Sequence, residues 1–283
     1  MKFIIGLIVV FASTLVGFTL SGGALLALWH PTELLIIGGA AFGAFIITNP
    51  ASTIKMVFSG IGGLFGGSPY TRDRYLQTFG LLYSLFQKAR KEGLMGIEND
   101  IEEPQESDIF SKFPDVIKDH HAITFLCDYM RMVVGGNMNP FELDSMMDDE
   151  LEAQHEHHLE GAEAINRMAD ALPGFGIVAA VLGIVITMAS LTEGPEVIGH
   201  KVAAALVGTF TGILLSYGFL GPVSGDYHAR ANDEAHYLGS IKAAILASVQ
   251  GYTPQIAIEF ARKAMPGHIR PSFQETEEYV RSL

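Results

Sequence analysis

The sequence predicts an all-α integral membrane protein with four transmembrane helices and long cytoplasmic helical extensions. Only 17% of its 283 residues are charged, against about 25% in an ordinary soluble domain. The formal net charge is nevertheless −13, so the charges must be concentrated in some stretches and missing from others. Four stretches lack Asp, Glu, Lys and Arg, and each reaches the roughly 20 residues that a membrane-spanning helix needs. They cover residues 3–32, 34–54, 171–192 and 202–225.

The first two stretches leave room for other interpretations. The second is the weakest predicted span, because its strictly apolar part (residues 34–47) is short and Asn49-Pro50 follows. The first has the features of a signal peptide, with Lys2 followed by an apolar run. That run, residues 3–20, is longer than the usual hydrophobic region of about 7–15 residues. We therefore expect it to remain as a span.

Four spans place both termini on the same side of the bilayer. On that side the span ends carry Lys2, Lys55, Arg167 and Arg230, whereas Lys201 stands alone on the other. Because basic residues mark cytoplasmic loops, we expect both termini to be cytoplasmic. The predicted organisation is a first transmembrane hairpin at residues 1–54, a cytoplasmic helical loop at 55–170, a second transmembrane hairpin at 171–225 and a cytoplasmic helical tail at 226–283.

The cytoplasmic segments also predict helices. An amphipathic pattern from Asp73 ends at Gly93, and a second predicted helix covers residues 122–134. Asn139, Pro140 and Glu142 form a start signal for one long helix over residues 140–192. The fourth span is expected to continue to Val249, and two short tail helices are expected to begin at residues 254 and 273, after capping residues.

The residues give little support to enzymatic or nucleic-acid chemistry. The acidic surplus argues against nucleic-acid binding. The single cysteine, Cys127, excludes a disulfide framework and any multi-cysteine zinc or iron–sulfur site. His155, His157 and His158 lack the H-E-x-x-H spacing, so a solvated helix face is favoured over a metal site. No phosphate-binding loop or nucleophile motif is present, and we expect no catalytic residues, no metal and no cofactor.

The membrane stretches carry two notable features. None of them contains a carboxylate or a cationic side chain, although ion pumps usually carry such groups within the membrane. If this chain helps ions to cross the membrane, the carboxylate that binds them comes from another polypeptide. The alternative is that the chain conducts no ions. Small residues at a spacing of four favour contacts with partner helices over packing within the chain. These pairs are Gly176/Ala180, Ala179/Gly183 and Gly208/Gly212.

Prolines and hydroxyl groups mark the last two spans. Pro173 and Pro222 lie near the predicted cytoplasmic ends, where each is either a static kink or a hinge. Thr209 could line a water path or bond back to its own helix, and the second is the commoner arrangement.

Several short motifs recur together along the whole chain. They are ARKEG at 89–93, IENDIE at 97–102, LPGFGIVAA at 172–180, VGTF at 207–210, Gly218-Phe219 with Pro222, and PQIAIEF at 254–260. With the spacing of the four spans, these motifs resemble the MotA family of flagellar motor stator subunits, within the MotA/TolQ/ExbB proton channel family.

The resemblance implies a multi-pass protein of the bacterial inner membrane that couples inward proton flow to torque. It implies a homopentamer around a MotB dimer, with MotB supplying the ion-binding aspartate, and a cytoplasmic loop that engages the rotor protein FliG. On matching positions, Arg90, Glu98 and Glu150 would contact the rotor, and Pro173 and Pro222 would couple ion movement to shape change.

The resemblance also bears on the choice of ion. Sodium-type relatives have a hydroxyl residue where this chain has Ala180, so Ala180 favours protons, with Thr209 as the nearest hydroxyl along the ion path. An ExbB/TolQ-type energiser of an envelope system is the alternative function. Such proteins usually have three spans and lack a loop like the one that carries Arg90 and Glu98, and both differences disfavour this alternative. A passive membrane scaffold is a third possibility.

Overall fold

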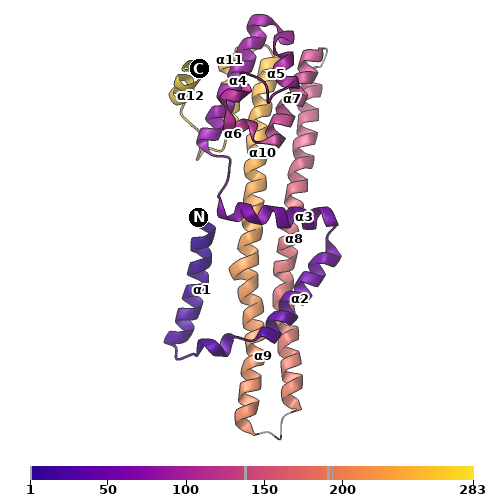
Figure 1. The fold of residues 1–283 in the computed structure, drawn as a ribbon, viewed down its shortest axis with the longest axis vertical. Helices are drawn as coiled ribbons and strands as arrows, with labels where there is room; N and C mark the ends of the chain where they lie inside the picture. Colours follow the sequence, from indigo (N-terminus) through magenta and orange to yellow (C-terminus); the bar gives the residue numbers. More distant parts are fainter. Residues whose placement is uncertain (1, 137–138, 190–191, 193) are drawn as a thin grey trace. The chain divides into compact units, whose positions relative to one another are not determined.

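The computed structural model describes residues 2–136, 139–189, 192 and 194–283, and every regular element among them is helical (Figure 1). The chain divides into two compact units. Unit 1 contains Met1–Gly67 and His157–Ala229, and unit 2 contains Ser68–Glu156 and Arg230–Leu283. Helices α8 (Pro140–Met188) and α10 (Gly221–Val249) contribute residues to both units.

Unit 1 is built from the apolar helices. Four helical segments are long and apolar enough to cross a membrane: Lys2–Leu20, Leu25–Thr48, and parts of Pro140–Met188 and Pro195–Val249. This confirms the predicted fold class. The elements are α1 (Lys2–Leu20), η1 (Leu25–Leu28), α2 (Pro31–Thr48), α3 (Ala51–Gly60), η2 (Ile61–Phe65), the C-terminal part of α8, α9 (Pro195–Leu215), the π-helical turn η5 (Ser216–Leu220) and the start of α10.

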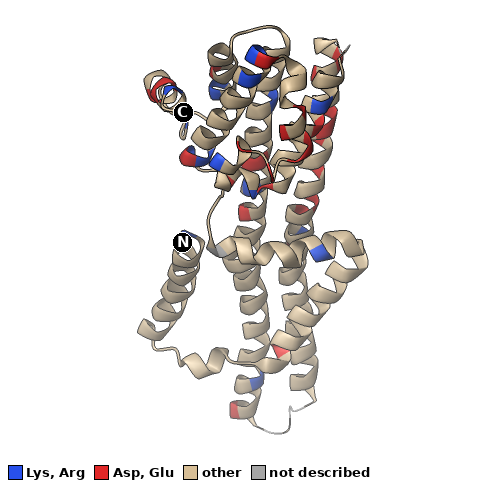
Figure 2. Cartoon of the chain, turned by 45° about the horizontal axis from the view of Figure 1, so that its top comes forward, with Lys and Arg blue, Asp and Glu red and all other residues tan. Residues whose placement is uncertain are grey.

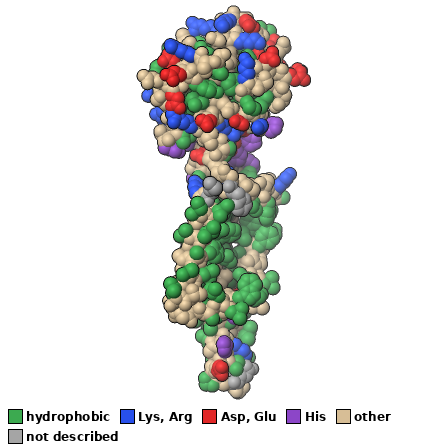
Figure 3. Space-filling view, turned by 60° about the vertical axis from the view of Figure 1, so that its left-hand side comes forward, with side chains coloured by type: hydrophobic (Ala, Val, Ile, Leu, Met, Phe, Trp, Pro, Cys, Tyr) green, Lys and Arg blue, Asp and Glu red, His purple; other side chains and the backbone are tan. Residues whose placement is uncertain are grey.

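Apolar side chains cover much of the surface of unit 1 (Figure 3). No described residue of α1 is buried, and Val181, Ile184 and Val185 of α8 are also exposed. A soluble protein does not expose a continuous apolar surface of this kind. Lipid or partner helices must therefore cover it, as expected of a multi-pass membrane protein.

Unit 2 has an ordinary hydrophobic core and carries charged side chains on its surface (Figures 2 and 3). Its core includes Tyr75, Phe79, Phe125, Tyr237 and Ile245, all 0–1% exposed. The elements are α4 (Arg72–Glu92), η3 (Leu94–Ile97), α5 (Glu98–Glu102), η4 (Phe110–Lys112), α6 (Pro114–Ile117), α7 (His120–Gly135), the N-terminal part of α8, most of α10, α11 (Pro254–Ala264) and α12 (Phe273–Arg281).

Local signals explain most of the helix boundaries. Thr71, Thr253 and Ser272 cap α4, α11 and α12 with their side chains. Asn139 accepts a hydrogen bond from the amide of Phe141 at the start of α8. The long helix ends at Met188 rather than at residue 192, and Ser190 and Leu191 lie outside the described residues.

Candidate functional site

Glycines bring α8 and α9 of unit 1 into backbone contact. A Cβ on Gly212 would lie 2.6 Å from the carbonyl oxygen of Leu172, and one on Gly176 would lie 3.0 Å from the carbonyl oxygen of Gly208. A Cβ on Gly183 would lie 2.8 Å from that of Ala205. The expectation that these small residues face partner helices is therefore wrong. They are used within the chain, because only glycine lets the two helices approach this closely.

The predicted coupling and ion-path residues flank this contact. Pro173 lies inside α8, next to Leu172 at the closest approach to α9. On α9, the Cα of Thr209 would lie 3.3 Å from a Cβ on Gly176. Ala180 follows Ala179, whose Cβ packs on Gly208. Pro173, Ala180 and Thr209 are all half-buried, so the structure brings all three predicted residues to one helix pair.

Pro222 lies beside an irregular turn of the last span. It is the second residue of α10 and is exposed, and the preceding residues Ser216–Leu220 form a π-helical turn. Proline has no amide hydrogen to donate to the carbonyl four residues earlier, which here belongs to Gly218. Single π turns often occur at functional sites. The sequence predicted one continuous helix here and missed this turn.

Glu33 is a candidate that the sequence analysis missed. In the sequence Glu33 separates two uncharged stretches and so marks a boundary between two predicted spans, but α2 begins at Pro31 and includes Glu33 in its first turn. A Cβ added to Gly208 would lie 3.5 Å from Cγ of Glu33, so this side chain packs directly on α9. Proline at the first helical position followed by an acidic residue is a helix-start signal, and it could have placed Glu33 inside the helix.

In unit 2, two of the predicted rotor-contacting residues lie on either side of one turn. Arg90 is in the last turn of α4, and Glu98 is the first residue of α5. Gly93, with φ of +83°, ends α4, and the 3₁₀ turn η3 connects the two helices. Both side chains are exposed, and neither forms a hydrogen bond or ion pair with another residue that the structure describes. They are free to contact a partner.

Hydrogen bonds between side chains and to the backbone hold this turn in place. Nζ of Lys88 donates a hydrogen bond to Oδ2 of Asp100 at 2.8 Å, and Oγ of Ser107 donates to Oδ1 at 2.6 Å. Arg131 of α7 donates to Glu102 at 2.9 Å and to the carbonyl oxygen of Ile101 at 3.0 Å. The Lys88–Asp100 contact joins α5 to α4, and those of Arg131 join it to α7. These contacts hold α5, whose first residue Glu98 ends the Arg90–Glu98 edge, defined here as residues 90–98.

Glu150 lies in a different environment. It is half-buried on α8, and its Oε1 accepts a hydrogen bond from Nε2 of Gln154 at 2.8 Å. Burial, and next the nearby Glu150 carboxylate, raise the pKa of Tyr129 of α7, whose hydroxyl donates a hydrogen bond to the carbonyl oxygen of Met146 at 3.1 Å. The Glu150 carboxylate is therefore engaged within unit 2, unlike Arg90 and Glu98.

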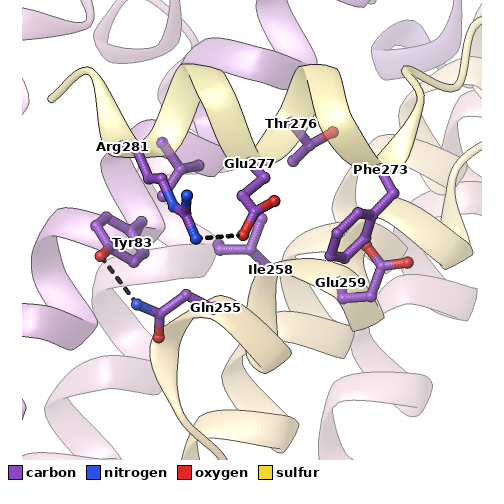
Figure 4. A pocket seen from close by; sticks show the side chains of 9 residues that line it. Tyr83, Gln255, Ile258, Glu259, Phe273, Thr276, Glu277 and Arg281 are labelled. Atoms are coloured by element: carbon purple, nitrogen blue, oxygen red, sulfur yellow. Dashed lines mark hydrogen bonds and ion pairs between the residues drawn. The ribbon is translucent and has the colours of Figure 1, made fainter.

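The groove between α4, α11 and α12 is too small for a cofactor (Figure 4). Its volume is about 50 Å³, whereas small-molecule sites usually occupy about 300–1,000 Å³. Gln255 donates to the hydroxyl of Tyr83 at 3.2 Å across one end, and Arg281 pairs with Glu277 at 2.7 Å. The groove is a packing feature of the tail helices.

Comparison with known proteins finds two families along the chain. The family described as "Motility protein A N-terminal" matches residues 4–93, and the "MotA/TolQ/ExbB proton channel family" matches residues 119–239. Motility protein A of Salmonella typhimurium is 40% identical over 283 residues, which cover 100% of this chain and 96% of that protein. Motility protein A of Escherichia coli is 38% identical with the same coverage.

Solved structures share the fold. The C. jejuni MotAB structure matches with a TM-score of 0.79 at 23% identity, over 96% of this chain and 98% of that one. The flagellar MotAB stator complex from Bacillus subtilis matches with a TM-score of 0.75 at 25% identity, over 97% and 98% of the two chains. These matches cover both units.

Proposed function

Since this chain belongs to the motility protein A family, within the MotA/TolQ/ExbB proton channel family, we propose that it couples inward proton flow to rotation of the flagellar rotor. It is a stator subunit that forms a proton channel together with MotB, and not an enzyme. The observation that carries this function is 40% identity to a motility protein A over the full chain. The match of residues 4–93 to the N-terminal family of motility protein A also favours a flagellar stator over an ExbB/TolQ-type energiser.

The partner supplies what the spans lack. MotB contributes the carboxylate that binds the ion, and this chain surrounds it as a ring of five copies around a MotB dimer. The exposed apolar surfaces of α1 and α8 support this arrangement, because they require helices or lipid to cover them. Both termini and unit 2 face the cytoplasm of the bacterial cell, and the spans lie in the inner membrane, as the distribution of basic residues favours.

The Arg90–Glu98 edge contacts the rotor through charged residues of FliG. Support comes from the exposure of Arg90 and Glu98 and from the absence of internal partners for these two side chains among the described residues. Opposite charges on the rotor surface would guide the two proteins together and fix their relative position, which is the usual role of charges at the rim of an interface. Glu150 is a further contact, although it must release Gln154 to act.

Ion movement reaches unit 2 through α8 and α10. Pro173 lies at the closest contact of α8 with α9, and Pro222 lies next to the π-helical turn of the last span. A transmembrane potential supplies about 2.3 kcal/mol per charge per 100 mV, and this energy drives the change of these two helices. Ala180 and Thr209 line the ion path. With alanine at position 180, the path offers too few oxygen ligands for sodium and suits protons.

A deletion strain tests the proposal. Expression of this chain with its own MotB should restore swimming to cells that assemble flagella but do not rotate them. The chain without MotB should restore nothing and should leave the proton permeability of the membrane unchanged. Failure to restore rotation with MotB present, at normal membrane levels of both proteins, would refute the stator function. Dependence of swimming on sodium rather than on protons would refute the ion assignment.

A further inference from the structure

Glu33 places a carboxylate within the apolar part of unit 1. Its side chain is about 13% exposed, and its Cγ would lie 3.5 Å from a Cβ on Gly208. Gly208 is seven residues beyond Lys201, the last charged residue before the uncharged part of α9, which corresponds to roughly 10 Å along a helix. The stem of Glu33 therefore packs on α9 inside the uncharged stretch, one residue before Thr209.

The surroundings of this carboxylate lack a fixed cation. Oγ1 of Thr32 donates to Oε2 of Glu33 at 3.0 Å, and Nδ1 of His30 lies 3.8 Å from the same oxygen. No Lys or Arg among the described residues pairs with Glu33. The facing surface of α9 presents Gly208, and α8 presents Ala179 beside it, so His30 is the titratable group that faces Glu33. A structural carboxylate in an apolar setting would be expected to have a cationic partner.

We propose that Glu33 is a proton-binding site at the outer end of the ion path. The inference rests on the proposed proton channel function and adds a group of this chain to it. A proton from external water binds the carboxylate of Glu33 to give the neutral acid. The acid then returns that proton to water farther along α9, toward Thr209 and the carboxylate of MotB, and becomes a carboxylate again. Intramembrane carboxylates in proton-translocating proteins serve such relays.

The site predicts a response to external pH. Cells carrying Glu33→Gln with MotB should swim about twofold or more slower than wild type at external pH of about 8.5, where protons are scarce, and close to wild type near pH 6. Glu33→Asp should give an intermediate profile, because it keeps the carboxylate but shortens its reach. Glu196→Gln removes an exposed carboxylate from the first turn of α9 and should follow wild type at every pH.

The outcomes separate this inference from the proposed function. If wild-type chain fails to restore swimming, the stator function fails, whatever Glu33 does. If wild type swims and Glu33→Gln follows its pH profile, or is slowed by the same factor at every pH, the proton-binding site is refuted. If Glu33→Gln does not accumulate in the membrane, the pH profiles of swimming of the His30→Ala and Glu33→Asp variants test the proposal instead. A pH profile unchanged in both would refute the proposal, and a shift in either toward slower swimming at high pH would support it.

Discussion

Nζ of Lys88 donates a hydrogen bond to Oδ2 of Asp100 across 2.8 Å and thereby ties α4 to the start of α5. Asp100 is 7% exposed and also accepts a hydrogen bond from Ser107. The hydrogen bond to Asp100 raises the pKa of Lys88 above its ordinary value, so the ammonium stays charged at any physiological pH. The geometry of the Arg90–Glu98 edge thus depends on a contact that lies just beneath it.

Removing the ammonium of Lys88 should loosen this edge. Lys88→Met leaves the Asp100 carboxylate with fewer partners in a nearly buried position, at a cost of about 1–3 kcal/mol. We expect slower swimming with little change in the amount of membrane-bound protein. Lys112→Met removes an exposed cation of η4 and serves as the control. Equal swimming speeds for the two variants would argue against a positioning role for Lys88.

Reversing the charges of the edge should impair rotation without unfolding the protein. Arg90 and Glu98 are exposed, and substitutions at exposed positions usually change stability by less than about 0.5 kcal/mol. Arg90→Glu and Glu98→Lys should each reduce swimming, while immunoblots show normal membrane levels. Compensating charge reversals on FliG should recover part of the speed. Normal swimming by both single variants would exclude the rotor contact.

A methyl group at the closest approach of α8 and α9 should destabilise unit 1. In Gly212→Ala the new Cβ would lie 2.6 Å from the backbone oxygen of Leu172, which cannot move aside as a side chain could. Overpacking of this kind costs about 1–3 kcal/mol, and the melting temperature of the purified protein should fall.

Gly199 offers a matched control on the same helix. A Cβ there would meet nothing within 4 Å, and alanine favours the helix by about 1 kcal/mol over glycine. Gly199→Ala should therefore melt at or above the wild-type temperature. If Gly212→Ala has the same melting temperature as Gly199→Ala, then α8 and α9 do not pack as closely as the structure shows.

Cys127 should react slowly with thiol reagents in the folded protein. It is 2% exposed, and burial raises the pKa of its thiol to about 12. The thiolate is the reactive form, so maleimide labelling of the protein in detergent should be very slow near neutral pH and should become fast after denaturation. Since Cys127 is the single cysteine of the chain, the signal is unambiguous. Fast labelling of the folded protein would contradict the core of unit 2 around α7.

Much of the fold followed from the sequence. The pattern of charge-free stretches predicted the spans, because carrying a charge into hydrocarbon is costly wherever it occurs in the chain. The capping residues Thr253 and Ser272 predicted the two tail helices, since the hydrogen bonds that stop a helix from fraying are local. The pattern around Gly93 predicted the end of α4 for the same reason.

The site residues were less predictable. The resemblance supplied Arg90 and Glu98, but nothing local indicated that Lys88 and Asp100 would support them. Nothing local indicated a role for Glu33 either. In the sequence it only separates two uncharged stretches, whereas the fold places it against Gly208, far away in the chain.

The sequence by itself determined most of the helix ends and which helices are apolar, because those properties depend on neighbours a few residues apart and on solvent. Tertiary structure alone decided what the glycines of α8 and α9 contact and which carboxylate enters the apolar layer. Such contacts join residues that are 22 positions apart in the sequence at Gly183 and Ala205, and 175 apart at Glu33 and Gly208. They depend on how closely whole helices approach one another, and no local pattern records that distance.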